Sequence, residues 1–341
     1  MSVRGYYLRN YVVFGMGNRL SMFTKDTKLV CLGGGIGTVN LIRGLKHHTE
    51  NITVLISTAD DGGSAGRLRR LYNITPPGDA VSCLAALTRD DKSMNEAFLR
   101  FRFPGDRYGR DEELSGQKLG SLMLVAATQL TGDFGKAVSY LQKLFDSCGK
   151  ILPVTKENLH LTAVTVDGVE VESEEKIDLG KYEGERVLET VSIHPGNPTV
   201  GDGVLQALEE ADAIIAGPGD LYTTILPVLL VPQIAEYLRK ADKKKFLVIN
   251  VANKPFETRG YKTSGFVEAI EKHLGFFPFT DVVINSNTSV EIPSEYSYTY
   301  VENDLSEQGL GFNLCQSDLI DAEFPLYHSS QKLASCIGKQ L

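Results

Sequence analysis

Two apolar segments near the N-terminus each run directly into a glycine-rich loop, and this pairing restricts the possible folds more than any other feature of the chain. The first, Lys28–Leu32, precedes Gly33–Thr38 and a stretch with helical apolar periodicity. The second, Ile52–Ser57, precedes a loop that starts at Asp60. A strand, a helix and a second strand in this order are typical of a parallel βαβ unit with a right-handed crossover. The sequence therefore predicts an α/β fold.

The glycines of the first loop predict contact with an anion. Glycine lets the backbone approach a ligand closely, and the unpaired N–H groups and dipole of the following helix stabilise negative charge. In an open parallel sheet, ligands bind beyond the carboxyl ends of the strands, so neighbouring loops would face one crevice. A tight turn without a ligand is the alternative. The expected phosphate-binding residues of this loop are Gly33, Gly34, Gly35, Gly37 and Thr38.

The second loop combines carboxylates, a hydroxyl and guanidinium groups, which suits a metal-bridged or arginine-clamped diphosphate. Asp61 is the expected catalytic or metal-binding carboxylate, because Mg²⁺ on a diphosphate usually takes one or two protein carboxylates and several waters. Asp60 can instead cap the helix that starts near Ser64. The two arginines can clamp phosphate or pair with acids on an exposed face. The expected binding residues of this loop are Gly62, Gly63, Ser64, Arg67 and Arg69.

A third strand-to-glycine transition follows far along the chain, where Ala213–Ala216 precedes another glycine loop. It predicts a second phosphate or sugar contact, and the alternative is a rigid Pro-Gly turn with Tyr222 in the core. Asn250, at the end of the expected strand Phe246–Val251, can contact a base or a hydroxyl, or be an ordinary turn residue. The expected binding residues here are Gly217, Pro218, Gly219, Tyr222, Thr223 and Asn250.

The remaining segments complete a single predicted domain from 26 to 341, after an N-terminal extension over residues 1–25. Helical patterns from about 79 to 147 predict a helical insertion, with Asp79 as its first N-cap. Short strand patterns and the turn signal Asp167-Gly168 predict a small β excursion from about 165 to 190, with a solvated acidic segment at Glu170–Glu175. Beyond Pro195 the βαβ alternation returns. We therefore predict a Rossmann-like, mostly parallel sheet with helices on both faces.

Composition narrows the class of protein further. A net charge of −8 and a pI near 5.4 argue against general nucleic-acid binding, which needs clustered cations. Five cysteines without a Cys-x-x-Cys pair predict reduced thiols in the cytoplasm and no zinc site. No apolar run approaches the roughly 20 residues that a membrane span needs, so we predict no membrane insertion.

A nicotinamide enzyme has to be considered, because a glycine loop followed by an acid about 20 to 25 residues later is typical of dinucleotide-binding folds. The spacing differs, however. Gly33, Gly35 and Gly37 are separated by single residues, and Thr38 stands at the position of the third glycine of that motif. A Walker lysine is also missing after the loop, so we predict neither a P-loop nor a nicotinamide or flavin cofactor.

Four motifs together resemble the CofD/YvcK superfamily, over about residues 25 to 287: Gly33–Thr38, Asp60–Arg69, Pro76–Asp79 and Gly217–Pro227. The chain is more similar to the YvcK-like gluconeogenesis factors, for which the resemblance implies a UDP-sugar ligand, a homodimer and a cytoplasmic role in carbon metabolism, cell shape and wall synthesis. CofD itself implies the alternative, a 2-phospho-L-lactate transferase that moves a phospho-lactyl group from a guanosine diphosphate donor to a deazaflavin with Mg²⁺. The resemblance also implies that Asp61 lines a metal and diphosphate region.

Three polar stretches depart from the pattern of the YvcK-like proteins. Their L-S-G-H-N-F-G-N-L is L-S-G-Q-K-L-G-S-L at Leu114–Leu122, their P-P-G-D-I-R-N is P-P-G-D-A-V-S at Pro76–Ser82, and their Q-P-G-E-T is K-P-F-E-T at Lys254–Thr258. The glycine scaffold is kept while polar contacts change. The sequence therefore predicts a divergent member that retains nucleotide binding.

Overall fold

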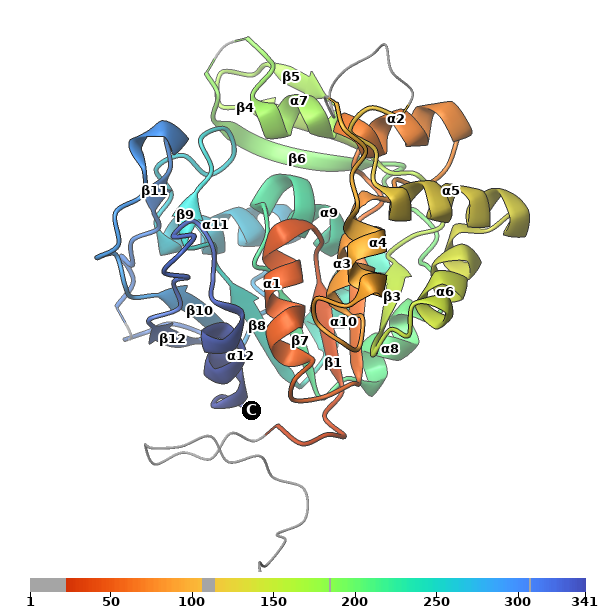
Figure 1. Cartoon of the computed structure of the whole chain (residues 1–341). Coiled ribbons are helices and arrows are strands. Elements are labelled where there is room, and N and C mark those ends of the chain that lie inside the picture. Colours follow the sequence, from red (N-terminus) through yellow and green to blue (C-terminus); the bar gives the residue numbers. More distant parts are fainter. Residues whose placement is uncertain (1–22, 106–113, 184, 307) are drawn as a thin grey trace, which may run out of the picture.

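A seven-stranded sheet, in which every pair of neighbouring strands is parallel, forms the centre of the molecule (Figure 1). The computed structural model describes residues 23–105, 114–183, 185–306 and 308–341. The predicted Rossmann-like α/β class is confirmed. Across the sheet the strands follow the order β12 (Asn313–Ser317), β10 (Asp281–Asn285), β8 (Lys244–Val248), β7 (Ala213–Ala216), β1 (Leu29–Leu32), β2 (Ile52–Ile56) and β3 (Gly149–Pro153).

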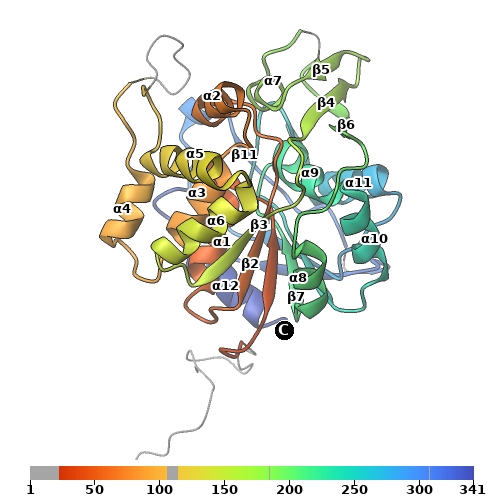
Figure 2. The same ribbon diagram turned by 90° about the vertical axis from the view of Figure 1, so that its right-hand side faces the viewer.

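Side chains of β1 enter two separate apolar cores, one on each face of the sheet. Leu29 and Cys31 belong to one core, and Val30 and Leu32 to the other. Such continuous apolar strands need helices on both faces, as Figure 2 shows. The first core also contains side chains of α1 (Gly35–Leu45), α3 (Gly78–Ala86), α6 (Phe134–Leu144) and α12 (Ser330–Gly338). The second core contains side chains of α8 (Val204–Glu210), α9 (Leu226–Leu229), α10 (Pro232–Lys240) and α11 (Thr263–Leu274).

The helices expected between 79 and 147 form the connection between the neighbouring strands β2 and β3. In this segment α3 is followed by α4 (Met94–Arg100), α5 (Leu119–Thr131) and α6. Helix α3 packs against α1 and touches β2 and β3, while α6 packs against β3. The segment thus covers one face of the sheet as well as extending away from it. Before it, α2 (Gly63–Tyr72) follows β2 at the carboxyl end of the sheet.

A three-stranded antiparallel sheet stands over the carboxyl ends of the main strands, beside α2 (Figure 1). It contains β5 (Glu170–Glu172), β4 (His160–Thr165) and β6 (Leu188–His194), together with α7 (Glu174–Leu179). The Gly168 N–H donates to the Thr165 carbonyl, which closes the hairpin at the predicted turn. We call β4, β5, α7 and β6 the β module.

Both ends of the described chain pack into the fold. Phe23 is buried and stacks on His48, and the Thr49 hydroxyl donates to the Lys25 carbonyl. Residues 23–25 therefore contact the domain predicted from residue 26 onward, and residues 1–22 of the expected extension lie outside the described residues. At the other end, α12 packs against α1. Short elements lie between: β9 (Ala252–Asn253) paired with β11 (Thr299–Tyr300), and the 3-10 turn η2 (Ser294–Tyr296).

Within the described ranges, none of the individual helices combines the length and the apolar composition of a membrane span. Residues 221–229 and 232–240 reach that length and composition together, but the two parts meet at a bend of 75°. Leu226, Val228 and Leu229 of this pair lie fully buried in the second core.

Candidate ligand-binding cleft

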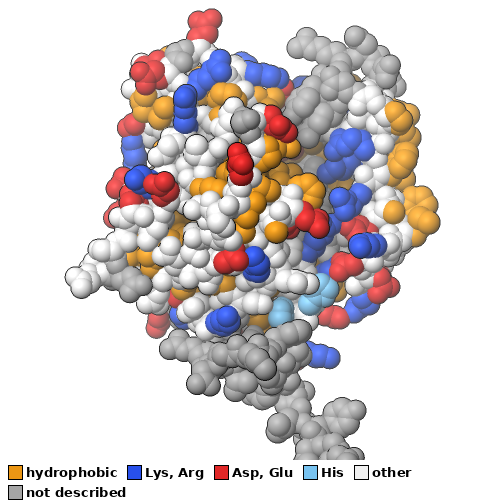
Figure 3. All heavy atoms as spheres, turned by 60° about the vertical axis from the view of Figure 1, so that its left-hand side comes forward, with side chains coloured by type: hydrophobic (Ala, Val, Ile, Leu, Met, Phe, Trp, Pro, Cys, Tyr) orange, Lys and Arg blue, Asp and Glu red, His pale blue; other side chains and the backbone are white. Residues whose placement is uncertain are grey.

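The carboxyl end of the main sheet carries a cleft made of two joined cavities, of about 640 Å³ and 330 Å³. The space-filling view in Figure 3 shows basic side chains gathered in and below a hollow on one face of the molecule. Residues of the first and third glycine loops and of α7 border both cavities, and Lys254 does so as well. The second glycine loop borders the larger one. All three loops therefore meet at one cleft.

The first glycine loop lies where the two cavities join. Gly35 and Ile36 line both, and Gly34 and Gly37 line the smaller one. In the first turn of α1, the Ile36 and Gly37 N–H groups have no acceptor among the described residues, whereas the Gly35 N–H donates to Asp79 Oδ1 at 3.0 Å. These amides can bind an anion.

Close packing against the third loop explains the glycine at position 37. A Cβ atom there would lie 2.4 Å from the Pro218 carbonyl oxygen. The buried hydroxyl of Thr38 donates to the same oxygen at 3.4 Å. Gly33 and Thr38 line neither cavity, and both pack within the first and third loops.

The second loop points its two aspartates in different directions, which corrects the expected role of Asp61. Asp61 Oδ1 accepts hydrogen bonds from the Glu175 N–H at 2.9 Å and the Ser173 hydroxyl at 3.0 Å, so it caps α7. Asp60 instead lies on the wall of the larger cavity, where its Oδ1 accepts from the Gly62 N–H at 3.0 Å. We therefore transfer the expected cleft carboxylate from Asp61 to Asp60.

The N-terminus of α2 already has a carboxylate partner. Glu175 Oε2 accepts from the Gly63 N–H at 3.1 Å, so α2 and α7 cap each other's first turns. Gly62, Gly63 and Ser64 all line the larger cavity. The acidic segment expected to be solvated therefore reaches the cleft, which corrects the expectation for Glu174 and Glu175.

Arg67 and Arg69 do not line either cavity, contrary to the expected phosphate clamp. Arg69 is buried, and its guanidinium donates to the carbonyl oxygens of Ala59 and Leu159 at 3.1 and 2.6 Å. Arg67 donates to the Ser115 carbonyl. Both side chains thus hold backbone segments around the cleft. The sequence alone could not distinguish arginines that bind backbone carbonyls from arginines that bind an anion, because both kinds can occupy the same position in such a loop.

Other basic side chains form one wall of the larger cavity, and the sequence analysis missed them as a group. Lys118 Nζ donates to the Ser82 hydroxyl at 2.8 Å, and Arg102 donates to the Ser64 hydroxyl at 3.3 Å. Two further arginines on this wall pair with the buried carboxylate of Glu96. The members of this basic wall are Arg43, Arg100, Arg102 and Lys118.

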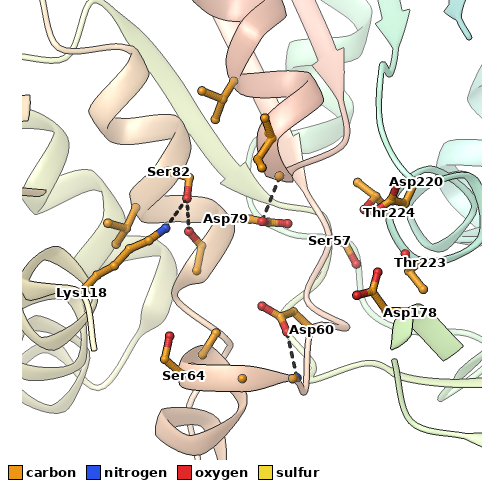
Figure 4. A pocket seen from close by; sticks show the side chains of 18 of the residues that line it. Ser57, Asp60, Ser64, Asp79, Ser82, Lys118, Asp178, Asp220, Thr223 and Thr224 are labelled. Carbon is orange, nitrogen blue, oxygen red and sulfur yellow. Dashed lines mark hydrogen bonds between the residues drawn. The ribbon is translucent and has the colours of Figure 1, made fainter. Parts of the chain in front are cut away.

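Acidic side chains form the opposite wall, and Figure 4 shows Lys118 across the cavity from Asp178 and Asp220. Burial raises the pKa of Asp79, which lies between the two walls beside the first loop. Burial and the neighbouring Asp60 and Asp178 raise the pKa of Glu174 well above its usual range. The acidic wall therefore offers carboxyl oxygens as hydrogen-bond acceptors, and burial favours the protonated form of Asp79 and Glu174.

Lys254 lies among three carboxylates at the junction of the two cavities. Its Nζ contacts Asp178, Asp220 Oδ2 at 2.8 Å and Glu257 Oε1 at 3.5 Å. Burial opposes its charge, yet these acids together raise the pKa of Lys254 well above its usual value. Glu257 is buried, which raises its pKa to about 7.

The same three carboxylates, Asp178, Asp220 and Glu257, form the one candidate metal-ligand group within the described part of the chain, with oxygens within 4.8 Å of one another. Hard divalent cations take oxygen donors of this kind, so the donor set is compatible with Mg²⁺. The ammonium of Lys254 already contacts all three. The arrangement fits a divalent cation only if Lys254 leaves.

The third loop divides its residues between the cleft and the core. Pro218, Gly219 and Asn250 line the smaller cavity, where Asn250 Oδ1 accepts from the Gly219 N–H at 3.0 Å. Tyr222, in the π-helical turn η1 (Leu221–Ile225), is buried, and its hydroxyl lies 2.7 Å from the Tyr261 hydroxyl. Of the two alternatives for Tyr222, the core position is therefore the observed one.

Two further residues of the third loop differ in their access to the cleft. Gly217 lines neither cavity, whereas Thr223 lines the larger one and donates to Glu257 Oε1 at 2.7 Å. The smaller cavity is also lined by residues from segments without a predicted site: Tyr298, Leu326, Tyr327 and His328.

Comparison with known proteins identifies the family. A family model described as 2-phospho-L-lactate transferase CofD matches residues 29–320. The chain belongs to the CofD/UPF0052 family. It is 35% identical to the gluconeogenesis factor of Bacillus subtilis over 91% of this chain and 96% of that protein, and 32% identical to the gluconeogenesis factor of Halalkalibacterium halodurans over 92% and 96%. It covers 69% and 58% of homologues from a Nostoc species and Clostridium acetobutylicum.

A crystal structure of a UPF0052 member from Bacillus halodurans superposes on this CofD/UPF0052 domain with a TM-score of 0.82 and 31% identity, covering 92% of this chain and 99% of that one. The three stretches that depart from the YvcK-like pattern all reach the cleft, through Ser82, Lys118 and Lys254. The hydrogen bond between Lys118 and Ser82 joins two of them. The departures therefore alter the groups that line the cleft.

Proposed function

We propose that this protein binds a nucleotide sugar, in the first instance a UDP-sugar, as a cytoplasmic regulator linked to carbon metabolism, cell shape and wall synthesis. The proposal depends most on the position of the first turn of α1: Ile36 lines both cavities, Gly37 lines the smaller one, and their N–H groups have no acceptor among the described residues. If the diphosphate of a nucleotide sugar bound at this position, its nucleoside would enter one cavity and its sugar the other. The relatives named gluconeogenesis factor support the link to carbon metabolism.

Each cavity suits one end of such a ligand. The smaller one offers two tyrosines, an asparagine and a histidine, which match the stacking and hydrogen-bonding needs of a base: Tyr298, Tyr327, Asn250 and His328. The larger one offers carboxylates such as Asp60 and Asp178, which accept hydrogen bonds from sugar hydroxyls. The basic wall, with Lys118, lines the larger cavity and would place positive charge near the diphosphate.

Calorimetric titration tests this proposal. We expect UDP-N-acetylglucosamine or UDP-glucose to bind without being consumed, and GDP and NAD to bind more weakly, because the cleft would hold the base and the sugar together. Each titration is run with and without Mg²⁺. Release of GMP from a guanosine diphosphate donor with a deazaflavin acceptor would instead support the transferase, the activity for which the matched family model is named.

Tyr327→Ala tests the assignment of the smaller cavity to the base. Loss of an aromatic partner for a base weakens binding by about 1–3 kcal/mol, so we expect at least a several-fold rise in Kd. Tyr140→Ala, at an exposed position of α6, is the matched control and should leave Kd unchanged. Equal affinities in the two variants would show that Tyr327 does not contact the ligand.

The homodimer that the resemblance implies remains a proposal, and the titrations with and without Mg²⁺ test whether a metal takes part in binding. Sedimentation velocity of the full chain with and without a UDP-sugar measures the oligomeric state directly. Any effect of Mg²⁺ on ligand binding depends on the acidic cluster around Lys254, because the metal ion and the Lys254 ammonium group would contact the same carboxylate oxygens.

A further inference from the structure

Three carboxylates from separate segments converge around Lys254. Asp178 comes from α7, Asp220 directly precedes η1, and Glu257 follows β9. Their oxygens lie within 4.8 Å of one another, so one cation can contact all three. The cation that does so is the Lys254 ammonium, through contacts that include Asp220 at 2.8 Å and Glu257 at 3.5 Å.

The ammonium group uses its full donor capacity in this cluster. It has three N–H donors, and it has three carboxylate partners. Glu257 is also held in place, because its oxygens accept from the Tyr222 N–H at 2.9 Å and the Thr223 hydroxyl at 2.7 Å. A divalent ion placed among these oxygens would lie within a few ångströms of the ammonium charge, where repulsion between like charges is strong in a partly buried site.

We propose that Lys254 replaces a divalent cation in this cluster, so that the chain binds its ligand without a metal between these three carboxylates. Lys254 is then a specificity-determining residue, since it decides which cofactor the cleft accepts. This inference rests on the proposed function in one respect, namely that the ligand contains a diphosphate. The α1 amides and the basic wall neutralise the phosphates in place of the metal.

A charge-removing substitution tests this replacement. Lys254→Gln removes the charge and keeps a polar side chain that is one bond shorter, while Lys254→Arg is the matched control that keeps the charge. Binding of Mn²⁺ is measured by calorimetry and by electron paramagnetic resonance, with no nucleotide present. We expect Lys254→Gln to bind one Mn²⁺ at least about tenfold more tightly than the wild type or Lys254→Arg, and Asp220→Asn in the Gln background to remove this gain.

Equal Mn²⁺ affinity in the wild type and in Lys254→Gln would overturn the inference. A measurement on the unmodified protein decides the matter even if the variants do not fold. Acetylation of Lys254 by an amine-reactive ester, followed by mass spectrometry, should be slow and unaffected by Mg²⁺. Faster acetylation with Mg²⁺ would show that the ion displaces the lysine. Because nucleotide is absent from both experiments, failure of the proposed UDP-sugar binding does not affect their outcome.

Discussion

His328 connects the ligand cleft to the stability of the protein through one side chain. It lines the smaller cavity and is 3% exposed. One ring nitrogen is hydrogen-bonded to the Ile249 backbone, and Nε2 has no partner among the residues that the structure describes. Burial lowers the pKa of His328 to about 4. The folded protein therefore keeps this imidazole neutral at pH values where an unfolded chain protonates it.

This shift predicts a pH-dependent loss of stability. The folded pKa of about 4 lies below the unfolded value near 6.5, so His328 contributes stability above pH 6.5 that is lost as the pH falls toward 4. Between pH 7 and pH 5 the loss from this group is about 2 kcal/mol. Urea unfolding of His328→Gln should show a correspondingly smaller pH dependence than the wild type. The same substitution at the exposed His194 should preserve the wild-type dependence; a parallel change there would contradict the assignment.

The sequence does not show which of the two neighbouring aspartates, Asp60 or Asp61, faces the cleft. Both follow the same strand, and the sequence predicts a carboxylate in the cleft at this point. Which of the two enters the cleft depends on α7, a helix more than one hundred residues away in the chain, because its N-terminus binds Asp61. Local pattern contains no information about that partner.

At the scale of elements, α2 and α7 hold the β module against the main sheet. Asp61 caps α7 and Glu175 caps α2, so each carboxylate satisfies amides of the other helix. Gly63 and Glu175, one residue from each helix, line the larger cavity. Docking of the β module and the shape of the cleft are therefore coupled.

Asp61→Ala should weaken this docking. Loss of a charged cap costs about 1–2 kcal/mol, and we expect that decrease in the free energy of urea unfolding. Hydrogen exchange should also accelerate in β4, β5 and α7 more than in the main sheet. Asp26→Ala, at an exposed aspartate, is the control. If both variants lose the same stability and exchange alike, the reciprocal capping does not hold the β module.

At the scale of the whole molecule, the C-terminal segment completes both the sheet and the smaller cavity. Strand β12 pairs with β10, and α12 packs closely on α1. A Cβ atom on Gly44 would lie 2.0 Å from the Ser330 carbonyl oxygen, so only glycine permits this approach. Tyr327 and His328 immediately precede α12.

Gly44→Ala should therefore affect stability and binding together. Overpacking of this kind costs about 1–3 kcal/mol, and a displaced α12 would move the wall of the smaller cavity. We expect a lower Tm and weaker UDP-sugar binding in the same variant. Gly135→Ala, in the first turn of α6, is the matched control, because only Asp133 Oδ1 lies near its Cβ position, at 3.3 Å. If Gly44→Ala lowers the Tm but leaves UDP-sugar binding unchanged, the position of α12 does not influence the smaller cavity.

The sequence by itself determined the parallel sheet, its helical faces and the meeting of glycine loops near strand ends, because apolar periodicity and glycine placement act locally. It also marked Ser82, Lys118 and Lys254 as altered positions. Only the tertiary structure decided the roles of individual polar groups: Arg69 beneath the loops, Tyr222 in the core, and Lys254 among three carboxylates. Hydrogen bonds and ion pairs between distant segments depend on which side chains the fold brings within a few ångströms, and this distance is not encoded in any local pattern.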